Sequence, residues 1–236
     1  MRIFIGWDSR FPEPGKVLAS SLRVHSSIPL DIRFLDLRHL RECYDFHPEH
    51  DPKASTEFTR SRFLVPWLCD YQGLAIFMDN DMTCLADIGK LCQMDMDGLA
   101  LRVRKHEQYE SAATKFGASG TPQEPYFRKL WSSLMIMNCA KLRSWTKGAV
   151  ESWPPSRLHR FQDIPDGEIG EVPDGWNDIE HQYRPGVTKL YHLTGGGPHL
   201  EGCENVVGAE VWYQARLDWL FANGMDTNTP VQRVKL

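Results

Sequence analysis

The sequence lacks three features that would direct its interpretation: paired cysteines, runs of one charge and long apolar segments. Its six cysteines include no Cys-x-x-Cys pair, which argues against a zinc knuckle and favours reduced thiols in a core. The 27 basic and 31 acidic residues are interspersed and give a formal net charge of -4, so we expect no nucleic-acid-binding surface. No stretch approaches the roughly 20 apolar residues that cross a bilayer. The apolar stretch in the opening "MRIFIGWDSR" is broken by Gly6 and Asp8 and is too short for a signal peptide, so we expect a cytoplasmic protein.

Apolar residues make up 42% of the 236 residues, which is enough for a substantial core. Extended and helical patterns alternate along the chain, which predicts an α/β fold with a sheet covered on both faces. In such a sheet, ligands bind at the carboxyl ends of the strands. We expect strands at 2–7, 30–37, 74–78, 98–103, 132–138 and 188–193, and helices at 15–27, 140–152 and 209–221, with shorter helices near 63–68 and 87.

The segment "LAIFMDNDMTC" places two carboxylates directly after an apolar strand. Side chains at i and i+2 of an extended chain point the same way, so Asp79 and Asp81 converge on one point if the strand leaves the sheet there. Two convergent carboxylates favour a hard cation such as magnesium or manganese. The alternative is an Asp/Asn turn at a strand end, where such side chains bond their own backbone.

His192 is the best third ligand, because it ends a predicted strand immediately before "TGGG". Glycines allow backbone amides to approach a phosphate closely. The alternative is that His192 bonds a carbonyl and that the glycines only form a turn. A different candidate region is the polar stretch 104–125, whose length favours a lid or an acceptor-side loop.

Four segments in order resemble motifs of the nucleotide-sugar glycosyltransferases of family eight. They are "STEFTRSRFLVPWLCDYQGLAIFMDNDM", "LWSSLMIMN", "DGEIGEVPDGWN" and "KLYHLTGGGP". The resemblance implies a single Rossmann-like GT-A domain over residues 1–236, with a mixed central sheet flanked by helices. Residues 1–100 would be the nucleotide- and metal-binding half, and residues 101–236 the acceptor- and sugar-binding half.

The resemblance also implies a divalent ion, manganese or magnesium, that bridges the diphosphate of a UDP-sugar. Asp79, Asp81 and His192 would be its ligands, and Asp79 would also touch the ribose. Arg62 would lie near the donor sugar and diphosphate, while Arg60 would be a solvated charge. The remaining residues implied to bind the nucleotide-sugar are Gly6, Trp7, Asp8, Asn80, Ser133, Gly195, Gly196 and His199.

The segment "DGEIG" resembles a changed form of the family's Asp-Gln-Asp motif, so that Asp166 and Glu168 would join Arg62 as catalytic residues. The middle Gln of the motif is replaced by Gly167. A lysine that many relatives carry after the glycines is also missing, and His199 or the glycine amides would replace its contact. The pair Trp176 and Asn177 matches a Trp-Asn pair that we interpret as structural.

The resemblance predicts transfer of a hexose from a UDP-sugar to a saccharide or another hydroxyl acceptor, with retention of configuration. An inverting enzyme is an alternative and would need a carboxylate base, for which Asp163, Asp166 and Glu168 are candidates. Further alternatives are a nucleotidyltransferase and an inactive sugar-nucleotide-binding protein. The identity of the sugar depends on the partners of single hydroxyl groups, which a sequence does not display.

Overall fold

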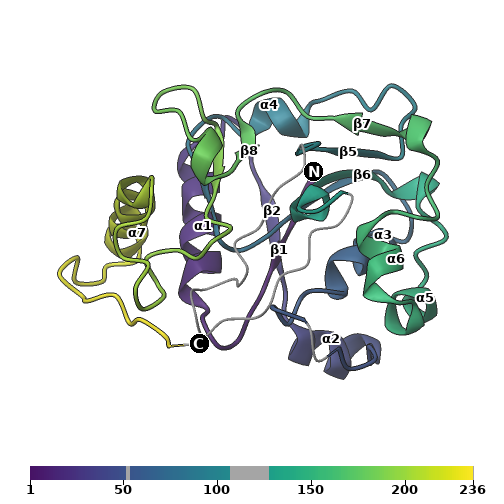
Figure 1. The fold of residues 1–236 in the computed structure, drawn as a ribbon, viewed down its shortest axis with the longest axis horizontal. Helices are drawn as coiled ribbons and strands as arrows, with labels where there is room; N and C mark the ends of the chain where they lie inside the picture. Colours follow the sequence, from purple (N-terminus) through teal and green to yellow (C-terminus); the bar gives the residue numbers. More distant parts are fainter. Residues whose placement is uncertain (52–53, 107–127, 236) are drawn as a thin grey trace.

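The computed structural model describes residues 1–51, 54–106 and 128–235. A six-stranded mixed sheet with the order β2-β1-β3-β6-β5-β7 forms its centre (Figure 1). Strands β1, β2 and β3 are mutually parallel, and β6 is antiparallel to both of its neighbours. The strands are β1 Arg2–Gly6, β2 Asp31–Leu35, β3 Leu74–Met78, β5 Leu101–Val103, β6 Leu134–Asn138 and β7 Ile169–Glu171. The predicted α/β fold with a mixed central sheet is therefore confirmed.

The central strands are apolar on both faces because both faces are covered. In β1, Ile3 and Ile5 belong to one hydrophobic cluster and Phe4 to the other, as alternation along a strand requires. Helices α1 and α4 contribute to the first cluster, and α2, α3, α5 and α6 to the second. Their bounds are α1 Glu13–Val24, α2 Leu37–Tyr44, α3 Val65–Leu68, α4 Gly89–Cys92, α5 Lys147–Ser152 and α6 Pro155–His159.

A second sheet of three short strands, in the order β4-β9-β8, was not predicted. It contains β4 Met82–Cys84, β8 Trp176–Asp178 and β9 Leu190–His192. The strand predicted at 188–193 is β9, and it pairs with β4 and β8 rather than with the central sheet. A strand of three residues shows too little alternation for its sheet to be assigned from sequence alone.

The last helix, α7 Ala209–Ala222, lies beside α1 at one side of the molecule (Figure 1). Arg216 of α7 and Glu13 of α1 form a partly buried ion pair at 2.8 Å, which fixes the two helices against each other. Among the described residues, no helix has the length and apolar character needed to cross a membrane.

Several local predictions differ from the structure for identifiable reasons. Helix α2 was missed because only Leu40 of it is buried, although Asp36 caps it by accepting from the Arg38 amide. The helix predicted over 140–152 begins only at Lys147, where Thr146 caps it. Four cysteines are buried thiols as expected, but Cys43 is exposed. The lid predicted over 104–125 lies, from residue 107 onward, outside the described residues.

Candidate metal centre

Asp79 and Asp81 lie where the chain crosses from the central sheet to the small sheet. Strand β3 is buried between β1 and β6 and ends at Met78, and β4 begins at Met82. The Asp79 amide donates to the carbonyl of Ser133, which precedes the neighbouring strand β6. The crossing segment is therefore anchored by backbone hydrogen bonding rather than ending in a free turn.

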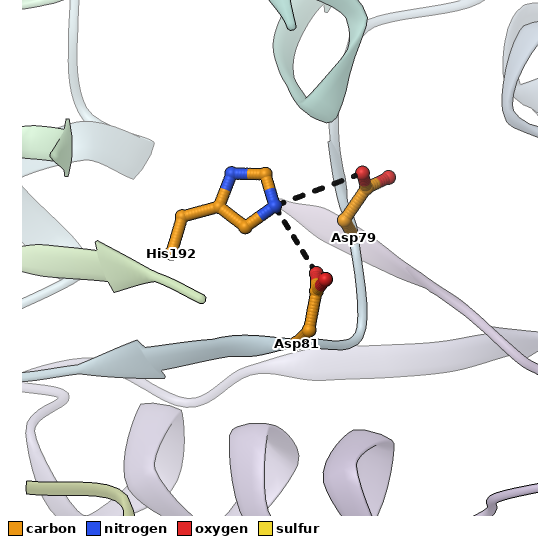
Figure 2. A group of neighbouring side chains, drawn as sticks. All are labelled: Asp79, Asp81 and His192. Carbon is orange, nitrogen blue, oxygen red and sulfur yellow. Dashed lines mark ion pairs between the residues drawn. The ribbon is translucent and has the colours of Figure 1, made fainter. Parts of the chain in front are cut away.

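His192 ends β9 and reaches the two carboxylates because β9 pairs antiparallel with β4. The pairing sets His192 opposite Met82, one residue after Asp81. Figure 2 shows the imidazole Nε2 directed at both carboxylates, 3.1 Å from Asp81 Oδ1 and 4.0 Å from Asp79 Oδ2. One potential ligand atom from each residue lies within 4.8 Å of the others. The predicted convergence of these three side chains is confirmed.

Arg62 balances part of the negative charge of this group. Its Nη1 lies 2.8 Å from Asp79 Oδ1 and donates to the Ser132 carbonyl at 3.0 Å. The guanidinium also lies over the rings of Phe58 and Phe77, with its Cζ 5.3 and 5.0 Å from their centroids. Arg62 is therefore held in a fixed position beside Asp79.

Arg60 does not have the solvated position that we predicted. It is buried, and its Nη1 donates to the carbonyls of Val150, Glu151 and Trp153. The two arginines do face different directions, as residues two apart on a helical turn must. Arg60 connects the segment before α3 to the end of α5.

The three side chains suit a divalent cation. His192 Nε2 is buried and has no hydrogen-bond partner among the described residues, although it faces two carboxylates. A cation shared by these groups would satisfy the lone pair of this nitrogen and the facing oxygens together. Two carboxylate oxygens and one imidazole nitrogen are ligands that magnesium and manganese accept, usually with water or phosphate oxygens completing the shell.

The glycine-rich loop after β9 does not offer its amides as we predicted. The Gly195 amide donates to Glu180 Oε1 at 2.7 Å, and Thr194 donates its hydroxyl to the other oxygen of Glu180. The Gly196 amide donates to the Leu193 carbonyl at 3.1 Å. In this structure both amides are therefore occupied by groups of the protein.

His199 lies near the cluster but does not replace the missing lysine as a cation. Its ring is buried and packs between Phe11 and Trp212, with centroid distances of 5.8 and 6.1 Å. Burial lowers the pKa of His199 to about 4, although the charge of Asp81 acts in the opposite direction. The imidazole is therefore neutral near pH 7 and supplies no positive charge for a diphosphate.

The end of β1 is occupied by contacts within the protein. Asp8 is fully buried, and its carboxylate pairs with Arg10 at 2.6 Å and accepts from the Glu57 amide. Trp7 packs edge-on against Phe34 with centroids 4.9 Å apart. The predicted nucleotide contacts of Trp7 and Asp8 stay predictions.

Two other predicted contacts at this end of the central sheet concern Gly6 and Asn80. A Cβ at Gly6 would lie 2.4 Å from the Phe58 ring, so the glycine is explained by close packing alone. Asn80, which stands between Asp79 and Asp81 in the sequence, is buried. Their roles in nucleotide binding also stay predictions.

The structure does not bring Glu168 to the Asp79–Asp81–His192 group. Glu168 pairs with Lys141 at 2.9 Å. Lys141 follows the end of β6 that lies beside Leu74, whereas Asp79 lies at the other end of β3. Asp166 pairs with Arg128, and its side chain is 85% exposed. Glu168 therefore takes no part in the chemistry that we propose below, and the catalytic role of Asp166 stays a prediction.

Two side chains near the site were given no functional role from the sequence. Asn177, which we interpreted as structural, lies between Ser133 and His192 and contacts both at 2.9 Å. His159 Nδ1 lies 2.7 Å from the hydroxyl of Ser132, whose carbonyl accepts from Arg62. Local sequence patterns do not predict these contacts, because the contacting residues are 15 or more positions apart in the chain.

No family model matches this chain. A search of curated proteins gives a relative that matches most of it. Protein CDI of Arabidopsis thaliana is 36% identical over 219 residues, which cover 89% of this chain and 84% of that protein.

Solved structures of glycosyltransferases resemble the fold. The galactosyltransferase LgtC, in complex with donor and acceptor sugar analogs, has a TM-score of 0.59 at 15% identity over 92% of this chain and 95% of its own. The bifunctional glycosyltransferase WbbM has a TM-score of 0.57 at 16% identity, over 92% of this chain and 49% of its own. GlyE of Streptococcus pneumoniae also has a TM-score of 0.57, at 13% identity over 97% of this chain and 65% of its own. At such identities the likeness shows the fold, and the predicted GT-A architecture is confirmed.

Proposed function

The chain belongs to the same family as Protein CDI of Arabidopsis thaliana, and we propose that it is a metal-dependent glycosyltransferase. The main support for the proposal is the convergence of Asp79, Asp81 and His192 at the strand ends of a fold that known glycosyltransferases share. A fold alone does not define an activity, so the proposal depends on the site. We further propose membership of family eight and a division between a nucleotide half, 1–100, and an acceptor half, 101–236.

The proposed donor is a UDP-hexose and the proposed acceptor is a saccharide or another hydroxyl compound. Asp79, Asp81 and His192 would hold the cation, manganese or magnesium. When bound, such a cation stabilises the negative charge that grows on the leaving diphosphate as the glycosidic bond breaks. Arg62 beside Asp79 supplies a fixed positive charge to the same region. These residues bind and orient the leaving group without transferring a proton.

Retention of configuration is the stereochemical outcome that the site favours. An inverting enzyme needs a carboxylate base near the acceptor, and the candidates were Asp163, Asp166 and Glu168. Asp166 and Glu168 pair with Arg128 and Lys141, and Asp163 accepts from the Ser144 hydroxyl. We propose instead that the acceptor attacks from the face that the diphosphate leaves, and that a phosphate oxygen takes the acceptor proton.

Calorimetric titration of UDP into the protein tests the proposal. We expect binding in the presence of manganese and its loss after chelation. Asp81→Ala should abolish the metal-dependent part, because it removes a ligand without disturbing a core side chain. Asp218→Ala, which changes a carboxylate on α7, is the matched control and should bind as the unmodified chain does.

The outcomes separate the alternatives. UDP binding that ignores both manganese and Asp81 would remove the metal-bridged diphosphate from the proposal. Hydrolysis or transfer at the anomeric carbon of a UDP-hexose would identify a glycosyltransferase, whereas cleavage between the phosphates would identify a nucleotidyltransferase. Binding without any turnover over a panel of UDP-sugars and acceptors would favour a sugar-nucleotide-binding protein.

A further inference from the structure

Asn177 occupies an unusual position beside the metal centre. The side chain is fully buried, and the backbone has φ +66°, in the left-handed region that Asn tolerates better than most residues. The pairing of β8 with β9 is irregular here, since Trp176 pairs with Leu190 and Asp178 with the next residue, Tyr191. Asn177 is therefore the extra residue of a β-bulge, a device that redirects a side chain out of the regular alternation.

The bulge directs the amide of Asn177 into a chain of hydrogen bonds that connects the two sheets. Asn177 Nδ2 lies 2.9 Å from Ser133 Oγ, and Asn177 Oδ1 lies 2.9 Å from His192 Nδ1. Ser133 in turn accepts from the Asp79 amide through its carbonyl at 2.9 Å. One continuous path therefore connects the ligand His192 of the small sheet to the ligand Asp79 beside the central sheet.

The direction of each hydrogen bond in this path follows from counting hydrogens. The hydroxyl of Ser133 lies 2.6 Å from the Leu130 carbonyl, which only accepts, so the single hydroxyl hydrogen is used there. Ser133 Oγ must then accept from Asn177, which requires that Nδ2 face it. The carbonyl oxygen of Asn177 consequently faces His192, and Nδ1 of His192 must carry a hydrogen.

A reversed amide would break this path at Ser133. Asn177 Oδ1 would then face a hydroxyl oxygen whose hydrogen is already donated to Leu130, so that two acceptors would meet in a buried site. Such an arrangement leaves buried polar atoms unsatisfied and is strongly disfavoured. The orientation with Nδ2 toward Ser133 is the consistent one.

We infer that Asn177 is a positioning residue that fixes the tautomer and the orientation of His192. With a hydrogen on Nδ1 donated to Asn177, Nε2 is the ring nitrogen left to bind a cation, and it is the atom that lies 3.1 Å from Asp81 Oδ1. The ring is thereby prepared to bind a cation before any cation arrives. The inference deepens the proposed function and depends on it for the identity of the metal, but the tautomer is a property of the metal-free chain.

Two substitutions separate the amide from the backbone. Asn177→Gly suits the left-handed backbone and removes both hydrogen bonds. Asn177→Asp keeps an oxygen that accepts from His192 Nδ1. Its second oxygen is satisfied when the Ser133 hydroxyl turns toward it from the Leu130 carbonyl, which still accepts from the Ser133 amide at 3.0 Å. Residues that hydrogen-bond a metal-ligating histidine in this way are typically worth about 10- to 100-fold in metal affinity. We expect N177G to weaken manganese binding by about that factor, and N177D to stay within about threefold of the unmodified chain.

The decisive measurement is the nitrogen-15 spectrum of His192 in the metal-free chain, taken above the usual histidine pKa, together with manganese titration. We expect His192 with hydrogen on Nδ1 in the unmodified chain and in N177D, and a mixture of tautomers in N177G. A ring without hydrogen on Nδ1 in the unmodified chain would overturn the inference, as would manganese affinity in N177G equal to that of the unmodified chain.

The two readouts keep this inference separate from the proposed function. If the unmodified chain binds no manganese while His192 shows the expected tautomer, the proposed metal site fails and the role of Asn177 stands. If N177G does not fold, the tautomer in the unmodified chain and in N177D still decides, because neither measurement needs the glycine variant.

Discussion

Arg62 Nη1 lies 2.8 Å from Asp79 Oδ1, and the two side chains are only 7% and 12% exposed. A buried ion pair is costly to assemble, and removal of one partner leaves an uncompensated charge. The pair also assigns different surroundings to the two carboxylates of the site. Asp79 is balanced by a guanidinium of the protein, whereas Asp81 faces the imidazole of His192.

Replacement of Arg62 by Met should destabilise the metal-free protein by about 3–5 kcal/mol, because Asp79 would stay buried without its cation. Urea denaturation in chelator measures this change. Arg33 is the matched control, since its pair with Asp31 has a similar distance of 2.9 Å but is about half exposed on both sides. Arg33→Met should cost only about 0–1 kcal/mol. Equal losses in both variants would contradict the buried role of Arg62.

The candidate metal site was predictable because each part of its signal is local. The buried run of β3 ends in two carboxylates at i and i+2, and His192 ends the strand before the glycines. The role of Asn177 was not predictable, since it depends on a bulge between β8 and β9 and on a left-handed backbone angle. The contact of Glu180 with the glycine-rich loop was not predicted for a similar reason, because Glu180 accepts from the amide of Gly195, 15 residues further along the chain.

The misplacement of Glu168 has a topological cause. A sequence motif indicates that an acidic residue lies beside a strand, but the order and direction of strands decide which end of the sheet it occupies. Strand β7 is an edge strand and runs parallel to β5, so that the residues before it lie at the end of the sheet away from Asp79. Only the assembled sheet reveals this.

Manganese should raise the melting temperature of the protein, and Asp81→Asn should remove most of that rise. A ligand that binds only the folded chain stabilises it by about 2.7 kcal/mol at a concentration of 100 times its Kd. The amide keeps the size of the side chain but loses the charge that the cation needs. Thermal melts with manganese and with chelator measure the difference. An equal rise in D81N would show that the stabilising ion binds elsewhere, and Asp218→Asn on α7 serves as the control.

Gly6→Ala should destabilise the protein through Phe58 rather than through the backbone. The new Cβ would lie 2.4 Å from the Phe58 ring, and such overpacking typically costs about 1–3 kcal/mol. A smaller side chain at position 58 should relieve the clash, so G6A and F58L together should cost less than the sum of their separate effects. Gly148→Ala in α5 is the control, because its Cβ would meet nothing within 4 Å. Strictly additive losses in the double variant would argue against this contact.

His199 should make the folded state less stable as the pH falls. Burial lowers its pKa to about 4 in the folded chain, whereas an unfolded histidine titrates near 6.5. Between these values the unfolded chain binds one more proton at this residue, so acid favours unfolding. The stability contribution is complete above about pH 6.5 and is lost toward pH 4, by up to about 1.4 kcal/mol per pH unit. In urea denaturation of the metal-free chain across this range, the free energy of unfolding should fall less steeply with decreasing pH in His199→Phe than in the unmodified chain. A phenylalanine ring also suits the contacts with Phe11 and Trp212. A nuclear magnetic resonance titration that gives His199 an ordinary histidine pKa would contradict the prediction.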